Sequence, residues 1–66
     1  MMSSRPPYWY EEGMKVVVNE DCPRRIDGVG TVISCFEKQG YNFPLVKIQF
    51  PNGEETISAH YLREVQ

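Results

Sequence analysis

The stretch RIDGVGTVIS, residues 25–34, decides the fold of this chain. It contains a Gly-x-Gly pair, and the β-formers Thr31, Val32 and Ile33 follow directly. A glycine loop that holds a phosphate is followed by a helix, because the helix N-terminus binds the anion. A strand pattern follows Gly30 instead. We therefore predict that the two glycines bend the chain into a strand and hold no phosphate.

Four other segments share this β pattern. In residues 14–18, Met14, Val16 and Val18 share one face, because successive side chains of a strand point to opposite faces. Phe36 and Phe50 are expected to fill part of the core. The predicted strands are 14–18, 29–37, 44–50, 55–58 and 63–65, with an Asn-Gly hairpin turn over 51–54 and a short 3-10 turn over 58–62. Five short strands without a convincing helix predict an all-β, five-stranded barrel.

The ten residues before the barrel have a different character. Pro6 and Pro7 favour extended backbone, so residues 1–10 are predicted to form an extended arm and residues 11–66 the barrel. The sequence YWY at 8–10 gives this arm three aromatic rings. One alternative is that Trp9 or a neighbouring Tyr folds back over the core. The other is that the arm docks on a partner or a second subunit.

Length and composition limit the classes of protein that fit. With 66 residues the chain holds one small core, and a formal net charge of −2 does not favour nucleic acid, which selects a basic surface. Cys22 and Cys35 do not form a disulfide framework, and no segment reads as a signal peptide or approaches the roughly 20 apolar residues of a membrane span. These features predict a cytoplasmic protein with free thiols and no membrane contact.

The pattern of glycines and apolar residues resembles SH3-like barrels, and KOW modules in particular. Those modules begin with a Gly, a strand of basic and apolar residues, a loop and then Gly-x-Gly-x-Val. The matching residues here are Gly13, Lys15, Val16, Val18, Gly28, Gly30 and Val32. The resemblance covers about residues 11–66 and implies a fold more than a function, because this barrel serves unrelated roles.

Three kinds of SH3-like protein imply three functions. The stromal barrel subunit of photosystem I, similar over Val29–Val32 and Phe43–Phe50, implies docking of electron-transfer proteins. KOW and Tudor-like modules imply binding to RNA, to ribosomal or polymerase surfaces, or to modified peptide tails. Type II dihydrofolate reductases are similar in layout. Their Val-Gln-Ile-Tyr active-site motif is replaced here by the sequence EETI at 54–57, which argues against an enzyme.

Candidate functional residues are a pair of arginines and the surplus aromatics. Arg24 and Arg25 are the only adjacent basic pair and could hold phosphate or carboxylate groups. Tyr and Trp suit protein interfaces because one edge of the ring is apolar and the other polar. The predicted binding residues are Trp9, Tyr10, Arg24, Arg25, Tyr41, Phe43 and Tyr61.

No catalytic or metal site is predicted. His60, the only histidine, is expected to be a surface or packing residue, and the cysteines are not spaced as metal ligands. The sequence implies no cofactor. It predicts a non-enzymatic binding or docking module for a protein partner or for self-association. The alternatives are a KOW- or Tudor-like nucleic-acid or ribonucleoprotein binder and a divergent relative of the reductase barrels.

Overall fold

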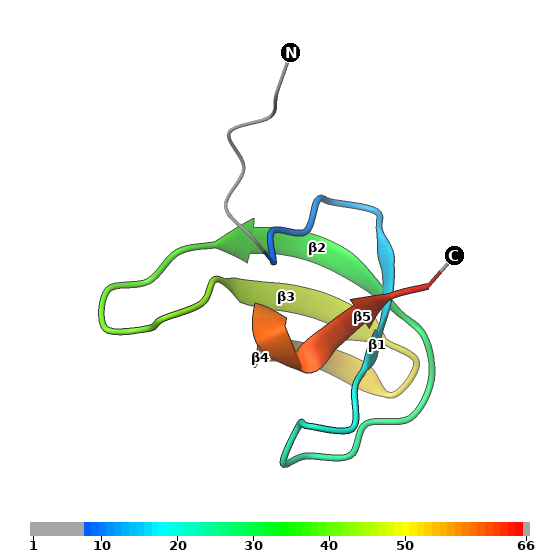
Figure 1. Cartoon of the computed structure of the whole chain (residues 1–66). Helices are drawn as coiled ribbons and strands as arrows, with labels where there is room; N and C mark the ends of the chain where they lie inside the picture. Colours follow the sequence, from blue (N-terminus) through cyan, green and yellow to red (C-terminus); the bar gives the residue numbers. More distant parts are fainter. Residues whose placement is uncertain (1–7, 66) are drawn as a thin grey trace.

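The chain folds into five antiparallel strands and one short 3-10 turn (Figure 1). The computed structural model describes residues 8–65, so residues 1–7 of the predicted arm lie outside the described residues. The elements are β1 (Lys15–Val18), β2 (Gly30–Phe36), β3 (Leu45–Phe50), β4 (Gly53–Ser58), η1 (Ala59–Tyr61) and β5 (Leu62–Glu64). The five predicted strands and the predicted 3-10 turn are therefore confirmed, with boundaries that differ by one or two residues.

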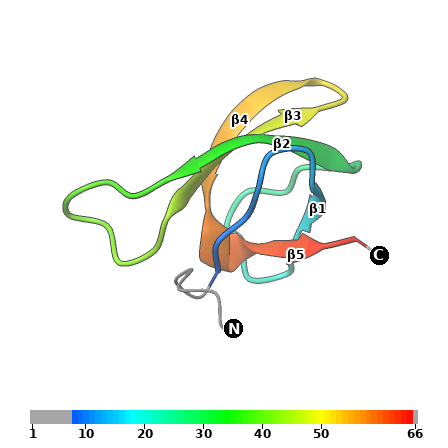
Figure 2. The ribbon, with the colours of Figure 1, turned by 90° about the horizontal axis from the view of Figure 1, so that it is seen from above.

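The strands form a single sheet in the order β4-β3-β2-β1-β5. In Figure 2 the long β2 strand curves between the β3–β4 hairpin and the β1–β5 pair. The prediction of a closed barrel is not confirmed. Among the described residues β4 pairs with β3 and β5 pairs with β1, but β4 and β5 do not pair with each other. η1 carries the chain from β4 at one edge of the sheet to β5 at the other.

The two glycines of the opening stretch have separate tasks. Gly28 has a φ of +96°, a left-handed conformation that non-glycine residues rarely adopt. Gly30 begins β2 and is buried; a Cβ atom there would lie 2.4 Å from Cγ2 of Ile48 and 2.9 Å from the ring of Phe50. The first glycine lets the chain turn and the second lets it pass close to β3. The predicted bend into a strand is thus confirmed.

A bulge in β2 overturns one expectation about the core. The pairing of β2 with β3 shifts between Val32 and Ser34, which changes the face on which the later residues of β2 lie. Cys35 then packs against the core, while Phe36 is 39% exposed. The prediction that Phe36 fills the core is wrong, because the alternation of faces restarts after the bulge.

The core lies between the curved strands. Val16, Val46 and Ile48 are fully buried, and Phe50, Ile57, Ala59 and Leu62 join the same cluster. The predicted inward face of residues 14–18 is confirmed, because Met14 and Val18 pack against this cluster. Each buried aliphatic side chain contributes about 1.5–3 kcal/mol, which a small domain of this size needs to offset its chain entropy.

The β3–β4 hairpin turns one residue earlier than predicted. Phe50 pairs with Gly53, so Pro51 and Asn52 are the two loop residues and Gly53 already belongs to β4. Proline has the φ that the first central position of a turn requires, which favours this position over an Asn-Gly centre. As a result β4 starts at Gly53 and not at residue 55.

Candidate functional site

Four rings from three segments of the chain form a continuous row. The ring of Tyr8 meets that of Phe43 edge-on, with centroids 5.1 Å apart. Phe43 stacks on His60 at 4.2 Å, and His60 contacts Tyr61 at 3.9 Å. We call Tyr8, Phe43, His60 and Tyr61 the aromatic row. It joins the chain before β1, the β2–β3 loop and η1, which are distant in sequence.

A groove borders one end of the aromatic row. It is lined by Tyr8 and by residues 37–44 of the β2–β3 loop, and its volume is about 490 Å³. This loop projects beyond the sheet in Figures 1 and 2. Tyr41 in the groove is 55% exposed, and the ammonium of Lys38 lies 5.7 Å from the centre of its ring. We call this the loop groove, which combines exposed rings with polar side chains.

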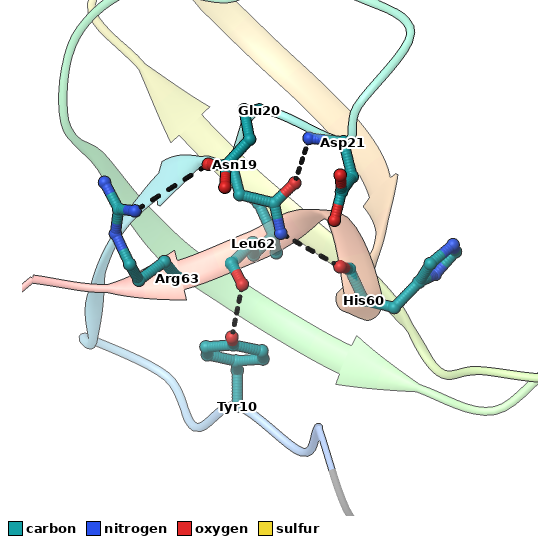
Figure 3. Close-up of polar contacts among 7 residues, drawn as sticks. All are labelled: Tyr10, Asn19, Glu20, Asp21, His60, Leu62 and Arg63. Atoms are coloured by element: carbon teal, nitrogen blue, oxygen red, sulfur yellow. Dashed lines mark hydrogen bonds and ion pairs between the residues drawn. The ribbon is translucent and has the colours of Figure 1, made fainter.

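Hydrogen bonds fix the end of the aromatic row that belongs to η1 (Figure 3). The side-chain amide of Asn19 donates to the carbonyl of His60 at 3.0 Å. The backbone N–H of Asn19 also donates to the carbonyl of Tyr61, at 2.8 Å. The next carbonyl, that of Leu62, accepts from the Tyr10 hydroxyl at 3.1 Å. Three successive carbonyls are thus held by residues from other parts of the chain.

The imidazole of His60 also has a polar partner. Its Nδ1 lies 2.8 Å from the hydroxyl oxygen of Ser58. In a nucleophilic catalytic site a serine and a histidine lie at this distance. Such a site also needs a group that orients the imidazole and donors that stabilise an oxyanion. The flanking rings of Phe43 and Tyr61 give the imidazole a packing role.

The two arginines of the predicted site lie on a different surface. Arg24 forms an ion pair with Glu55 of β4 at 2.9 Å, and Arg25 lies 3.6 Å from Asp27. Both arginines and Asp27 line a second groove of about 420 Å³, together with residues 18–20, Cys22 and Ile26. Because carboxylates already accompany both guanidinium groups, this surface offers little net positive charge to an anion.

The structure therefore divides the predicted site residues into separate groups. Tyr41 and Phe43 line the loop groove, and Tyr61 continues the aromatic row beyond His60. Arg24 and Arg25 line the second groove. Trp9 is half-buried beside Tyr8.

Tyr10 is a core residue, 9% exposed, as in the alternative that a tyrosine of the arm folds back over the core. Burial raises the pKa of the Tyr10 hydroxyl, and the nearby charge of Glu64 raises it further. Burial likewise raises the pKa of the Cys35 thiol. The backbone N–H of Tyr10, hydrogen-bonded to that thiol, lowers it in part, and the charge of Glu37 raises it. Both groups are therefore kept in their neutral forms at neutral pH, and neither is an activated nucleophile.

Sequence reasoning missed two residues of this site. Tyr8 was not among the predicted binding residues, and Asn19 was not considered. His60 was expected to be a surface or packing residue, and its position between the rings of Phe43 and Tyr61 agrees with packing. The adjacent aromatics at 60 and 61 were a local signal for a ring cluster. The role of Asn19 had no local signal, because its partner His60 lies 41 positions away.

A metal-binding cluster and a membrane-spanning helix are both absent from residues 8–65. No group of three or more His, Cys, Asp and Glu side chains in this range could hold a metal ion. In the same residues the structure has no helix with the length and apolar character that crossing a bilayer requires.

Comparison with known proteins found no matching family model, no matching curated protein and no matching solved structure.

Proposed function

We propose that this chain is a small non-enzymatic binding module that docks an extended segment of a protein partner. The observation that carries the proposal is the aromatic row, in which rings from three chain segments meet beside an open groove. Rings with one apolar and one polar edge are the side chains that contribute most at protein interfaces. An extended segment suits the groove because Gln39 and Asn42, whose side-chain amides can donate and accept hydrogen bonds, belong to its lining together with the rings.

We also propose that the module has an SH3-like arrangement of strands. Three features support this: the strand order β4-β3-β2-β1-β5, the lone 3-10 turn between β4 and β5, and the glycine bend at the start of β2. In this arrangement the β2–β3 loop and η1 lie side by side, as the stacking of Phe43 on His60 requires.

The charges of the described residues favour a protein over a nucleic acid. Arg24 pairs with Glu55, Arg63 lies 4.0 Å from Glu20, and Lys47 lies 3.8 Å from Glu54. A nucleic-acid surface works by replacing the counterions of phosphates with free cations. Cations that already have acidic neighbours are poorly suited to that task. Of the other described cations, Lys15 donates to the Thr31 hydroxyl and Lys38 lies over the ring of Tyr41.

The test compares surface variants that leave the core intact. Tyr8 and Tyr41 are 52% and 55% exposed, so a Tyr8→Ser/Tyr41→Ser protein should fold normally. The matched control is Val29→Ser, since Val29 is 46% exposed and lies outside the loop groove. Proteins captured from a lysate by the wild-type chain are identified, and the affinity of a purified partner is then measured for each variant.

We expect the double tyrosine variant to lose at least tenfold in affinity, and the control and an Arg24→Ala/Arg25→Ala protein to bind as wild type does. Equal binding by all variants would refute the aromatic site, and selective loss in the arginine variant would move the site to the second groove.

Affinity that falls steeply with salt would indicate a nucleic acid. Self-association in sedimentation experiments would identify a second copy as the partner, and turnover of nicotinamide and folate would indicate a reductase.

A further inference from the structure

Asn19 uses every one of its hydrogen-bonding groups on named partners. Its backbone N–H donates to the carbonyl of Tyr61, and its carbonyl accepts from the N–H of Cys22 at 3.2 Å. Its side-chain Oδ1 accepts from the N–H of Asp21 at 2.9 Å, and its Nδ2 donates to the carbonyl of His60. One residue thus connects the β1–β2 loop with η1 (Figure 3).

The bonds of Asn19 fall into two kinds. The bond from Asp21 to Oδ1 spans two residues and is the ordinary chemistry of an asparagine in a turn. The bond from Nδ2 to His60 joins residues that are 41 positions apart, and turn formation does not require it. Its effect must therefore be sought at η1 and not in the loop.

η1 needs such support because it is only three residues long. A 3-10 turn of this length has few hydrogen bonds of its own, and Ser58 at its N-cap makes no side-chain cap bond. The two bonds from Asn19 hold the carbonyls of His60 and Tyr61, which fixes the two peptide planes. The direction of each Cα–Cβ bond follows from those planes and sets where each ring begins, while the contact of His60 Nδ1 with the Ser58 hydroxyl at 2.8 Å orients the imidazole itself.

We infer that Asn19 is the positioning residue of the aromatic row, and that its Nδ2 donor sets the angle at which His60 stacks on Phe43. The inference rests on the proposed function for its biological meaning, but the geometry that it describes exists without a partner. Loss of this donor releases the His60 carbonyl and tilts its peptide plane, which shifts the imidazole relative to the Phe43 ring. The bonds from Ala59 N–H to the Pro44 carbonyl and from Asn19 N–H to the Tyr61 carbonyl still hold η1 in place.

The decisive variant is Asn19→Asp, which replaces the Nδ2 donor by an oxygen and adds one negative charge beside Glu20 and Asp21. The carboxylate has nearly the shape of the amide and still accepts from Asp21 N–H, so the turn persists. It cannot donate to the carbonyl of His60, and the two oxygens repel each other. The control is Asn52→Asp in the exposed β3–β4 turn, which adds the same charge away from the row.

The main readout is the proton NMR spectrum of the free protein. In Asn19→Asp we expect the ring-proton contacts between His60 and Phe43 to weaken and the His60 resonances to shift, while the methyl resonances of Val16 and Ile48 stay in place. Asn52→Asp should leave all of these unchanged. Unaltered His60–Phe43 contacts in Asn19→Asp would overturn the inference.

A second measurement on the wild-type protein covers the case in which Asn19→Asp fails to fold. One side-chain amide proton of Asn19 should exchange with solvent at least tenfold more slowly than those of Asn52, because it is hydrogen-bonded. Equal exchange rates would overturn the inference as well. With a partner in hand, Asn19→Asp should weaken binding about fivefold. Intact binding beside a disturbed row would count against the proposed function and leave the positioning role standing.

Discussion

The imidazole of His60 stacks on the ring of Phe43, with centroids 4.2 Å apart and planes inclined by 24°. Phe43 lies in the loop before β3 and His60 lies in η1 after β4, so this contact joins two elements at the same end of the sheet. The contact has an energetic consequence that can be measured without knowledge of any partner.

Replacement of both rings should reveal a coupling between them. We expect a double-mutant cycle of Phe43→Leu and His60→Ala to give an interaction free energy of about 0.5–1.5 kcal/mol, the range for aromatic pairs. Urea unfolding of the four proteins measures it. The same cycle with Tyr41→Leu, where no stacking on His60 is present, should give a value near zero; equal values in both cycles would show that the stack has no special energy.

Gly30→Ala should be severely destabilising. The added methyl group would lie 2.4 Å from Ile48 Cγ2 in a part of the core that has no free space. Overpacking of this kind costs about 1–3 kcal/mol or more, most of what a domain of this size has. Circular dichroism and urea unfolding measure the loss.

The matched control for that change is Gly40→Ala. Nothing lies within 4 Å of a Cβ at Gly40, but its φ of +92° disfavours a side chain. It should cost about 1 kcal/mol through backbone strain alone. A Gly40 variant as unstable as the Gly30 variant would contradict the view that close approach to β3 is the reason for Gly30.

Tyr10→Phe should lower stability at neutral pH by about 1 kcal/mol, because the carbonyl of Leu62 loses its hydrogen bond. The difference should shrink in alkali. Burial raises the pKa of Tyr10 above 10.0, so its contribution is complete below pH 10 and is lost as the pH rises through the folded value. Urea unfolding at pH 7 and above pH 10 tests both parts; a constant difference would mean that the hydroxyl titrates normally in the folded chain.

Cys35 should react slowly with alkylating reagents. In a Cys22→Ser protein, the rate of alkylation by iodoacetamide reports the thiolate of Cys35 alone. Because burial raises the pKa of this thiol above 9.0, the pH midpoint of the rate should be higher in the folded protein than in urea. A lower midpoint in the folded state would mean that the hydrogen bond from the Tyr10 backbone N–H outweighs burial at this thiol.

Much of the fold could be predicted from the sequence, because its signals are local. Alternating apolar residues indicated the strands, and Gly30 and the Asn-Gly pair at 52–53 marked places where the chain bends or turns. The face of Phe36 could not be predicted, since it depends on a bulge that is defined only by the pairing of β2 with β3. The closure of the sheet depends in the same way on contacts between strands.

The candidate site was harder to predict than the fold. Tyr41, Phe43 and Tyr61 were predicted as binding residues because the chain has more aromatic rings than a small core can bury. The structure places them in the loop groove and the aromatic row. Their separation from Arg24 and Arg25 could not be inferred, since it depends on which end of the sheet each loop occupies.

The aromatic row is assembled from three separate parts of the chain, so it exists only in the folded state. A ligand at concentration [L] that binds the row therefore raises the free energy of unfolding of the domain by RT ln(1 + [L]/Kd). A ligand present at a hundred times its dissociation constant would contribute about 2.7 kcal/mol, which is large for a chain with so small a core. A rise in melting temperature across a peptide library would therefore be a sensitive means to find the natural ligand.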